Sequence, residues 1–279
     1  MIHRRLTVLC LLALPLLIGG CSNEQGTAES GGGAPASAAE LAGPLQGARL
    51  VAPGSLTVCS DIPYAPFEYM SRDDGEGLTG FDVELVRTLA ERLGLRAEFK
   101  ATPFDSIIPA LAAGNCDMVA SATTITEERG SRVGFTAPYF DADQSLLIRA
   151  ADKDRYRSLT DLAGKVIGVQ SGTTGQRYAK AHALEGATVK DFPGAEDLFS
   201  ALTSGDIDAV LQDFPVNKHR ALKAPDQFAV TETFKTGEQY GFAVAKDNPR
   251  LVAALNDALA QTRESGDFEA LYRTWFGDR

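Results

Sequence analysis

The sequence predicts an α/β fold of two lobes joined by two crossings of the chain. Short apolar strands alternate with amphipathic helices over residues 56–124 and again over residues 159–213, a pattern typical of largely parallel sheets with helices on their faces. Extended segments at residues 144–148 and 240–245 indicate that the chain leaves the first lobe once and returns once. The sequence GNCDMV at residues 114–119 is echoed by GDIDAV at residues 205–210, consistent with two similarly built lobes.

Length and composition permit this architecture. The chain has 279 residues, of which 44% are hydrophobic and 23% charged, enough for one large domain or two ordinary ones with real cores. The formal net charge of -10 argues against a nucleic-acid surface. We expect residues 50–140 and 241–279 to form the first lobe and residues 141–240 the second.

The amino-terminal segment, residues 1–20, has the features of an export signal. His3, Arg4 and Arg5 precede an apolar run over residues 6–18 that is shorter than a membrane span. The following Ile-Gly-Gly-Cys, ending at Cys21, resembles a bacterial lipobox, which implies a diacylglyceryl thioether on Cys21. An uncleaved anchor or an ordinary signal peptide is the alternative. Residues 22–48 are rich in Gly, Ala, Ser, Pro and Glu, so we expect residues 21–49 to be a lipidated cysteine and a flexible tether.

The first lobe begins with a strand at residues 56–60 and a loop that carries aromatic rings. Pro63 and Pro66 prevent regular structure in this loop and fix an extended path. A turn at residues 72–77, a helix at residues 80–93, a strand at residues 96–100 and a helix at residues 105–113 follow. Ligands of parallel α/β sheets lie beyond the carboxyl ends of the strands, which is where Asp61, Phe104 and Ser121 fall.

Residues 114–139 contain a candidate carboxylate clamp. A short apolar strand at residues 118–120 ends in small and hydroxylic residues, Ser121 to Thr124. Thr126 is a plausible helix N-cap, and Arg129 occupies the place of the Glu or Gln of a capping box. The planar fork of Arg129 can turn back toward a carboxylate that Thr124 also contacts. The alternative is a surface arginine paired with Glu127, Glu128 or solvent.

The second lobe offers two groups of polar residues at strand ends. The loop QSGTTG at residues 170–175 lacks the Gly-Lys-Ser/Thr ending of a phosphate loop, but its amides near Thr173 and Thr174 can contact a carboxylate at a helix start. Asp213 ends an apolar strand and can neutralise an ammonium; a helix N-cap ahead of Pro215 is its alternative. Helices at residues 249–263 and 267–276 finish the chain, with Trp275 and Phe276 expected in the core.

Taken together, residues 50–278 resemble the polar amino-acid family of periplasmic-type solute-binding proteins that serve ABC importers. The resemblance implies the type II periplasmic-binding-protein fold, an aromatic sandwich around the ligand, an arginine for its α-carboxylate and an aspartate for its α-ammonium. Core packing for Phe104, a turn role for Asp61, loop amides for Glu68 and a tight turn for the two threonines stay open as alternatives. The residues that we assign to the ligand are Asp61, Tyr64, Glu68, Phe104, Ser121, Ala122, Thr124, Arg129, Gln170, Thr173, Thr174 and Asp213.

The charges of this set favour a basic ligand. Once Arg129 and Asp213 have neutralised an amino-acid zwitterion, Asp61 remains for the side chain, with Glu68 if it points inward and the amides of Gln170 and Gln212. We therefore expect arginine, lysine or histidine, and glutamine next. The resemblance implies an ABC permease with transmembrane subunits and a cytoplasmic ATPase as the partner of a monomeric, lipid-anchored, extracytoplasmic protein. The alternative is a cyclohexadienyl (arogenate or prephenate) dehydratase on the same fold; we assign no catalytic residue, metal ligand, cofactor or nucleic-acid partner.

Cys59 and Cys116 are the two cysteines left after the export signal and the lipobox. Export to an oxidising compartment favours a disulfide between them. Cys59, however, lies near the carboxyl end of its strand, whereas Cys116 opens the strand that contains the apolar run at residues 118–120. If these parallel strands are neighbours with level ends, the cysteines are offset by about four residues, or ~13 Å, beyond bonding reach. We therefore expect two buried thiols.

Overall fold

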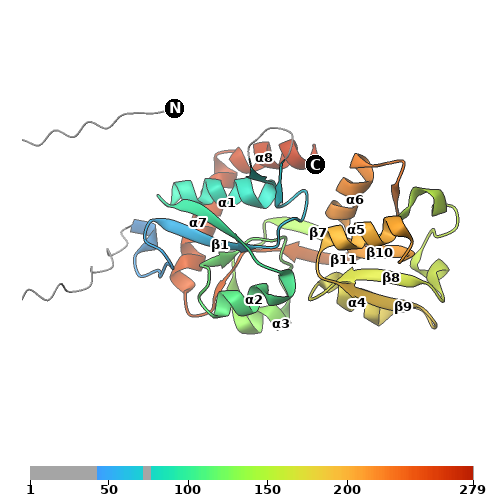
Figure 1. Cartoon of the computed structure of the whole chain (residues 1–279). Coiled ribbons are helices and arrows are strands. Elements are labelled where there is room, and N and C mark those ends of the chain that lie inside the picture. Colours follow the sequence, from blue (N-terminus) through green and yellow to red (C-terminus); the bar gives the residue numbers. More distant parts are fainter. Residues whose placement is uncertain (1–42, 72–76, 279) are drawn as a thin grey trace, which may run out of the picture. The chain divides into compact units, whose positions relative to one another are not determined.

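The computed structural model describes residues 43–71 and 77–278, and in them two β-sheets each have helices on both faces (Figure 1). The predicted α/β fold with two sheet-containing lobes is therefore confirmed. The export signal at residues 1–20, Cys21 and most of the expected tether lie outside the described residues.

The sheet of the first lobe has the strand order β4-β1-β5-β12-β6. β1 pairs in parallel with β4 and β5, whereas β12 is antiparallel to β5 and β6. The carboxyl-terminal part of the chain thus supplies a strand to the first sheet, as the return crossing predicted. The five strands are β1 (Ser55–Ser60), β4 (Arg96–Ala101), β5 (Met118–Val119), β6 (Val133–Phe135) and β12 (Ala243–Ala245).

Alternate residues of these strands bury their side chains on opposite faces of the sheet. Val58 packs in the core of α1 (Phe81–Arg92), α7 (Pro249–Glu264) and α8 (Asp267–Phe276). Its neighbour Cys59 packs with Ile107 of α2 (Phe104–Ala112), beside which α3 (Glu127–Arg132) lies. Figure 1 shows α1 and α8 above the sheet and α2 and α3 below it. A small hairpin of β2 (Tyr69–Met70) and β3 (Leu78–Thr79) completes this lobe.

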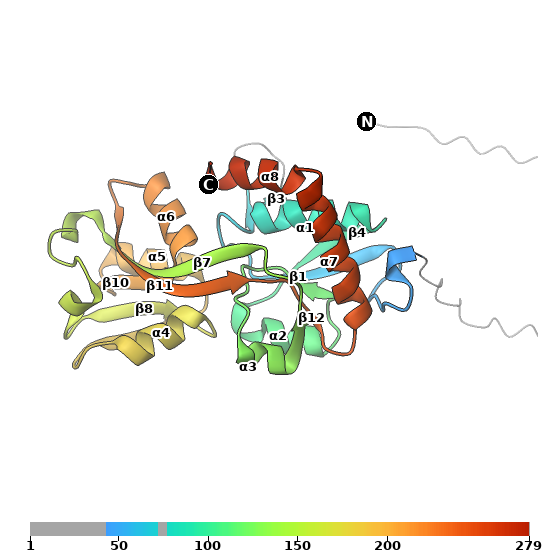
Figure 2. The ribbon, with the colours of Figure 1, turned by 180° about the vertical axis from the view of Figure 1, so that it is seen from behind.

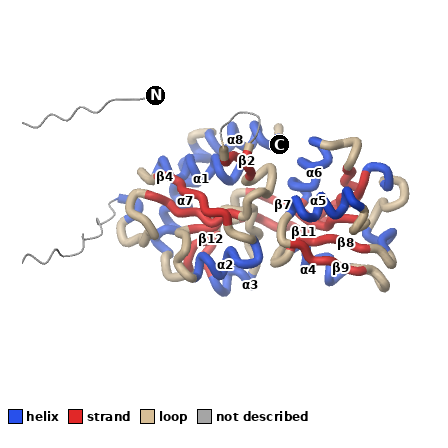
Figure 3. Tube along the Cα trace, in the orientation of Figure 1, coloured by secondary structure: helices blue, strands red, loops and turns tan. Residues whose placement is uncertain are grey.

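The sheet of the second lobe has the strand order β11-β7-β10-β8-β9. α4 (Thr174–His182) packs on one face with the 3-10 turn Leu159–Leu162, and α5 (Ala195–Ser204) and α6 (Phe214–Lys223) pack on the other (Figure 3). A second 3-10 turn, Ala150–Asp152, follows β7. The sequence analysis did not predict β9 or the residues of β11 before Tyr240, and it included the start of α6 only as the N-cap alternative for Asp213. The strands are β7 (Phe140–Arg149), β8 (Val166–Gln170), β9 (Thr188–Phe192), β10 (Ala209–Asp213) and β11 (Phe228–Tyr240).

The two crossings between the lobes run side by side. β7 and β11 are antiparallel neighbours, and Phe140 at the start of one is paired with Tyr240 at the end of the other. Figure 2 shows both strands extending between the two lobes, with β7 leading away from the first lobe and β11 leading back to it. Tyr240 also forms a β-bridge with Thr124 of the first lobe. The predicted crossing at residues 144–148 lies within β7, but of residues 240–245 only Tyr240 belongs to β11. β7 and β11, the hinge strands, position residues at the cleft as well as connecting the lobes.

The expectation of two free thiols is wrong, because Cys59 and Cys116 form a disulfide with a Cα–Cα distance of 5.8 Å. We had placed Cys116 in the strand, but β5 comprises only Met118–Val119. Cys116 lies in the connection from α2, where it is packed in the same cluster as Cys59 and Ile107. The offset along the strand therefore does not separate the two sulfur atoms.

Residues 43–49 also differ from the expected tether. A 3-10 turn forms at Gly43–Leu45, and the side chain of Leu45 is buried in the core that includes α7. Asn248 fixes Arg49, since its amide nitrogen donates to the Arg49 carbonyl at 2.8 Å and its oxygen accepts from the Arg49 amide at 3.2 Å. The ordered lobe therefore begins before residue 50. Among the described residues, no helix has the length and apolar character required to cross a membrane.

Candidate functional site

Ten residues from both lobes surround a narrow cavity where the lobes meet. Its volume is about 10 Å³, room for about one water molecule. Twelve residues were assigned to the ligand from the sequence. Ten of them line this cavity, and they come from both lobes. The lining residues are Tyr64, Phe104, Ser121, Ala122, Thr124, Arg129, Gln170, Thr173, Thr174 and Asp213.

Arg129 places a buried positive charge at one end of the cavity. Thr126 caps α3 by accepting a hydrogen bond from the Arg129 amide at 3.1 Å, as predicted. The Arg129 guanidinium donates to the carbonyl of Thr124 at 2.8 Å and, across the cleft, to that of Gly172 at 3.0 Å. Burial and the nearby Arg177 lower the pKa of Arg129 to about 10, so the group stays charged at neutral pH. The surface arginine considered as an alternative is therefore wrong.

Asp213 places a buried carboxyl group in the cavity wall contributed by the second lobe. It occupies the N-cap position of α6, but its side chain makes no capping hydrogen bond. Instead it accepts from Gln144 at 2.6 Å, from the hydroxyl of Tyr240 at 2.5 Å and from that of Tyr64 at 3.1 Å. Burial, with a smaller contribution from Glu238, raises the pKa of Asp213 to about 6. The carboxyl therefore has three donors and is ionised above that pH.

Two aromatic residues of the first lobe form further walls. Tyr64 is held by a tight loop in which its amide donates to the carbonyl of Glu68 at 2.6 Å, and its hydroxyl reaches across to Asp213. Phe104 begins α2, and the Arg129 guanidinium lies 5.2 Å from its ring centroid. The ring thus covers the apolar face of the cation. This position favours the predicted wall over the alternative of a core residue.

The strand end at Ser121 and Ala122 is held from behind by two buried carboxyl groups. The Ser121 hydroxyl donates to Glu68 at 2.5 Å, and the Ala122 amide donates to Asp82 at 2.9 Å. Ala122 has φ of 42°, a left-handed conformation that costs free energy in a non-glycine residue and needs such support. Burial raises the pKa of Glu68 well above its usual range and that of Asp82 to about 7. Asp82 was not identified from the sequence.

Asp61 and Glu68 are the two predicted residues that do not line the cavity. Glu68 is fully buried behind Ser121. Asp61 lies at the edge of the cleft, where it accepts a hydrogen bond from Gln170 of the other lobe at 2.6 Å. Burial raises the pKa of Asp61 to about 6. Both groups are thus close to the cavity without facing it.

Three residues of the hinge strands take part in the site but were not predicted from the sequence: Gln144, Glu238 and Tyr240. Gln144 donates to Asp213, to Glu238 at 2.9 Å and to Thr174 at 3.2 Å, and Tyr240 donates to Asp213. We had treated both crossings only as connections. The signal available was polar side chains within otherwise apolar extended segments, since a fully buried amide such as Gln144 requires partners.

Direct contacts hold the lobes closed over the cavity. Tyr64 bonds Asp213, Asp61 bonds Gln170 and Arg129 bonds the carbonyl of Gly172. A hydroxyl pair joins Thr124 and Thr174 at 3.5 Å. An amino acid between Arg129 and Asp213 has to separate Tyr64 from Asp213, because about 10 Å³ does not hold it. The described conformation is therefore a closed one.

Fold and cavity together define a two-lobed α/β binding protein that encloses a small polar ligand between its lobes. The sequence model of one protein family, the bacterial extracellular solute-binding proteins, family 3, matches residues 56–278 of this chain. This chain belongs to that family. The resemblance inferred from the sequence is thereby confirmed.

Curated relatives and solved structures agree with this assignment. The chain is 32% identical to the L-cystine-binding protein TcyJ of Escherichia coli over 80% of this chain and 83% of that protein. It is also 32% identical to the histidine-binding periplasmic protein of Salmonella typhimurium, over 80% and 88% of the two chains. An ancestral arginine-binding protein bound to arginine superposes with a TM-score of 0.74 at 37% identity, covering 80% of this chain and 99% of that one. These relatives are binding proteins and not enzymes.

Proposed function

We propose that this chain captures a free polar amino acid outside the cytoplasmic membrane and delivers it to an ABC import permease. The observation that carries the proposal is the placement of Arg129 and Asp213. These groups of opposite charge face one cavity from opposite lobes. An α-carboxylate fits the first and an α-ammonium the second. The names of the relatives, which bind cystine, histidine and arginine, support the same class of ligand.

Arginine, lysine or histidine is the ligand that the charges favour, with glutamine second. Asp61 lies at the cleft edge, and the carboxyl pair of Glu68 and Asp82 lies directly behind the wall at Ser121 and Ala122. Asp61, with a pKa of about 6, is ionised at neutral pH and makes the surroundings of a ligand side chain negative, whereas the raised pKa values of Glu68 and Asp82 reduce the share of charge that these two buried groups contribute. A basic side chain gains from that field, whereas glutamate or aspartate is repelled. The dehydratase alternative has less support, because the named relatives are binding proteins.

Thermal unfolding of the purified protein with each of the twenty amino acids, cystine and arogenate tests the proposal. A ligand that binds only the folded state raises the unfolding midpoint. We expect the largest increase with arginine, lysine or histidine. An increase of the unfolding midpoint with glutamate alone would contradict the preference for a basic side chain. Turnover of arogenate would show that the protein is an enzyme of the dehydratase class.

We further propose that residues 1–20 are removed as a lipoprotein signal and that Cys21 carries the lipid anchor, with the protein monomeric at the outer face of the membrane. The support is the Ile-Gly-Gly-Cys sequence at the end of the apolar run. In cells, Cys21→Ser should release the protein from the membrane fraction. Retention of Cys21→Ser in the membrane would mean that another segment anchors the chain.

A further inference from the structure

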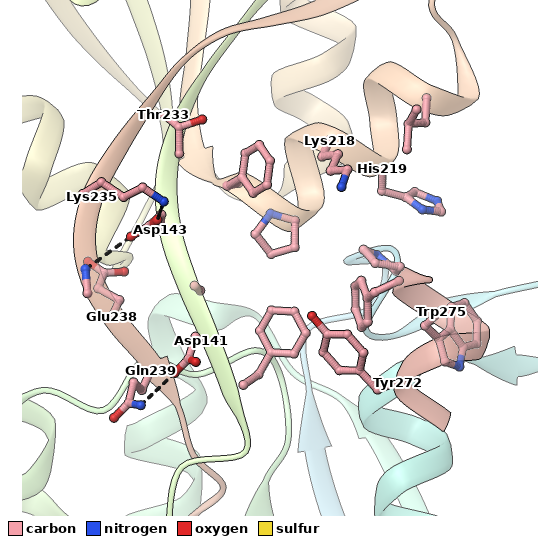
Figure 4. Close-up of a pocket in the computed structure, with 18 of the residues that line it drawn as sticks. Asp141, Asp143, Lys218, His219, Thr233, Lys235, Glu238, Gln239, Tyr272 and Trp275 are labelled. Carbon is pink, nitrogen blue, oxygen red and sulfur yellow. Dashed lines mark hydrogen bonds and ion pairs between the residues drawn. The ribbon is translucent and has the colours of Figure 1, made fainter. Parts of the chain in front are cut away.

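A second and larger cavity lies between α6 of the second lobe and α8 of the first, bordered by the hinge strands β7 and β11 (Figure 4). Its volume is about 720 Å³, within the range of small-molecule sites, which often occur between domains. None of its lining residues lines the cavity at Arg129 and Asp213. Five aromatic side chains dominate its wall: Phe140, Phe214, Tyr272, Trp275 and Phe276.

Most acidic side chains of this second cavity are engaged with partners of their own. Figure 4 shows Asp143 turned to Lys235, at 2.8 Å, and Asp141 turned to Gln239, at 2.7 Å. Asp278 pairs with Arg273 at 3.1 Å. Glu238, like Asp141, has a neutral partner, since it accepts from Gln144 at 2.9 Å. The carboxylates without a compensating cation, Asp141 and Glu238, thus lie on the hinge strands, across the cavity from Lys218 (Figure 4).

Lys218 is the cation on the side of the cavity away from the hinge strands. Its ammonium lies 5.7 Å from the ring centroid of Phe214, and within residues 43–71 and 77–278 no carboxylate pairs with it. Lys218 and His219 on α6 lie across the cavity from Tyr272 and Trp275 on α8 (Figure 4). Burial, Lys223 and Arg220 lower the pKa of His219, so the imidazole is neutral at pH 7. Leu222, 70% exposed, adds an apolar surface at the rim.

We propose that this second cavity binds a small organic anion with a flat apolar body. The carboxylate or sulfonate of such a molecule pairs with Lys218, and its body packs against the aromatic wall. An unpaired cation beside exposed apolar surface is what an amphipathic anion requires. The site is separate from the amino-acid cavity and does not depend on the function proposed for it.

The position of the second cavity links it to the closing of the lobes. α6 begins directly after Asp213, and its Phe214 and Lys218 line the second cavity. Tyr272 and Trp275 belong to the first lobe. A ligand that touches α6 and α8 together binds best to one arrangement of the two lobes and so favours that arrangement. By reciprocity, the anion and the amino acid should change each other's affinity by the same factor.

The probe for the test is 1-anilinonaphthalene-8-sulfonate, a flat aromatic anion. Trp275 is the only tryptophan of the chain and lines the second cavity, so excitation of tryptophan should produce sensitised emission from a probe bound beside it. We expect saturable binding of about one probe per chain, with quenching of Trp275. Binding without saturation, or without energy transfer from Trp275, would overturn the proposal.

Two lysines of α6 provide a matched pair of variants. Lys218→Gln removes the cation that faces the cavity and should weaken probe binding at least about fivefold. Lys223→Gln removes a charge from the same helix outside the cavity and should leave the affinity within about twofold. Equal affinities for both variants and the unmodified protein would contradict the assignment. Unfolding midpoints of both variants, expected to be unchanged, exclude loss of folding.

Addition of the amino acid separates this site from the one between Arg129 and Asp213. We expect a saturating amino acid to leave the probe bound. Competitive displacement of the probe would show that it occupies the amino-acid cavity and would overturn the proposal. If no amino acid binds at all, the function proposed above fails, whereas the Lys218→Gln and Trp275 results still decide the anion site.

Discussion

At the scale of single residues, Arg129 combines burial with full charge. Its guanidinium bonds only main-chain carbonyls among the described residues, at Thr124 and Gly172. A buried cation without a carboxylate partner is costly. An anionic ligand group supplies the missing charge, which is why the site favours an α-carboxylate at this place.

We therefore expect Arg129→Ala to weaken amino-acid binding by at least about thirtyfold, since loss of a buried charge partner costs roughly 2–5 kcal/mol. Arg132→Ala is the control, because Arg132 is exposed in the last turn of the same helix. It should change the affinity less than about twofold. Calorimetric titration of both variants measures the difference, and an equal effect of the two substitutions would contradict the clamp.

Asp213 makes the affinity depend on pH. Its carboxyl has a pKa raised to about 6 by burial, and only the ionised form pairs with an α-ammonium. As the pH falls from 8 to 5, the free protein binds a proton that the ligand must displace, so the affinity should fall by up to about tenfold per pH unit below 6. Asp61, whose pKa is also raised to about 6, acts in the same direction for a basic side chain.

The measurement is the dissociation constant at pH 5, 6, 7 and 8. Asp213→Asn should weaken binding at pH 8 and flatten the pH profile. A constant affinity of the unmodified protein from pH 5 to pH 8 would mean that the Asp213 carboxyl does not pair with the ligand.

At the scale of elements, the start of α1 fixes the loop that carries Tyr64. The amides of Phe81 and Asp82 donate to the carbonyls of Pro66 and Phe67 at 2.9 and 3.0 Å. This close approach is possible because residue 80 is glycine. A Cβ atom on Gly80 would lie 2.1 Å from the Phe67 carbonyl oxygen. The φ angle of Gly80 is 132°, which also favours glycine.

Gly80→Ala should therefore destabilise the protein more than Gly94→Ala does. Gly94 also has positive φ, 70°, but a Cβ there meets nothing within 4 Å, so its substitution should cost about 1–2 kcal/mol. The clash at Gly80 should add a further ~1–3 kcal/mol. Denaturant unfolding of the two variants gives the difference in free energy, and equal costs would contradict the tight packing of this loop.

The disulfide joins β1 to the connection between α2 and β5. Its two cysteines are 57 residues apart, and a cross-link over such a loop stabilises by about 2–4 kcal/mol. Reduction should lower the unfolding midpoint of the unmodified protein. The same reductant should not change the midpoint of the Cys59→Ala/Cys116→Ala variant, which already lacks the bond. An unchanged midpoint of the unmodified protein on reduction would mean that this bond contributes no stability.

At the scale of the whole molecule, the alternation of strands and helices was sufficient to predict two sheet-containing lobes, whereas the extended segments located β7 but only the last residue of β11. Asp213 could be placed at the cavity because it ends an apolar strand, and ligands of such sheets lie beyond the carboxyl ends of the strands. Arg129 could be placed there because it follows the hydroxylic strand end at Thr124 within one short helix. The orientation of Glu68 could not be predicted, because a loop side chain can point to either side. Gln144 and Asp82 act through partners distant in sequence, such as Asp213 and Ala122. The disulfide was missed because it depends on the path of a connection.

Closure of the lobes is the step that turns this geometry into capture. Arg129 and Asp213 face the cavity from different lobes, so a ligand that contacts both lowers the free energy of the closed state more than that of the open one. The central claim is therefore that both ends of one amino acid are bound at once.

Calorimetric titration with L-arginine, agmatine and 5-guanidinopentanoate tests this claim most directly. Agmatine lacks the α-carboxylate that Arg129 would bind, and 5-guanidinopentanoate lacks the α-ammonium that Asp213 would bind. We expect L-arginine to bind and each analogue to bind at least about a hundredfold more weakly, since each leaves a buried charge unpaired. Equal binding of L-arginine and either analogue would contradict the account.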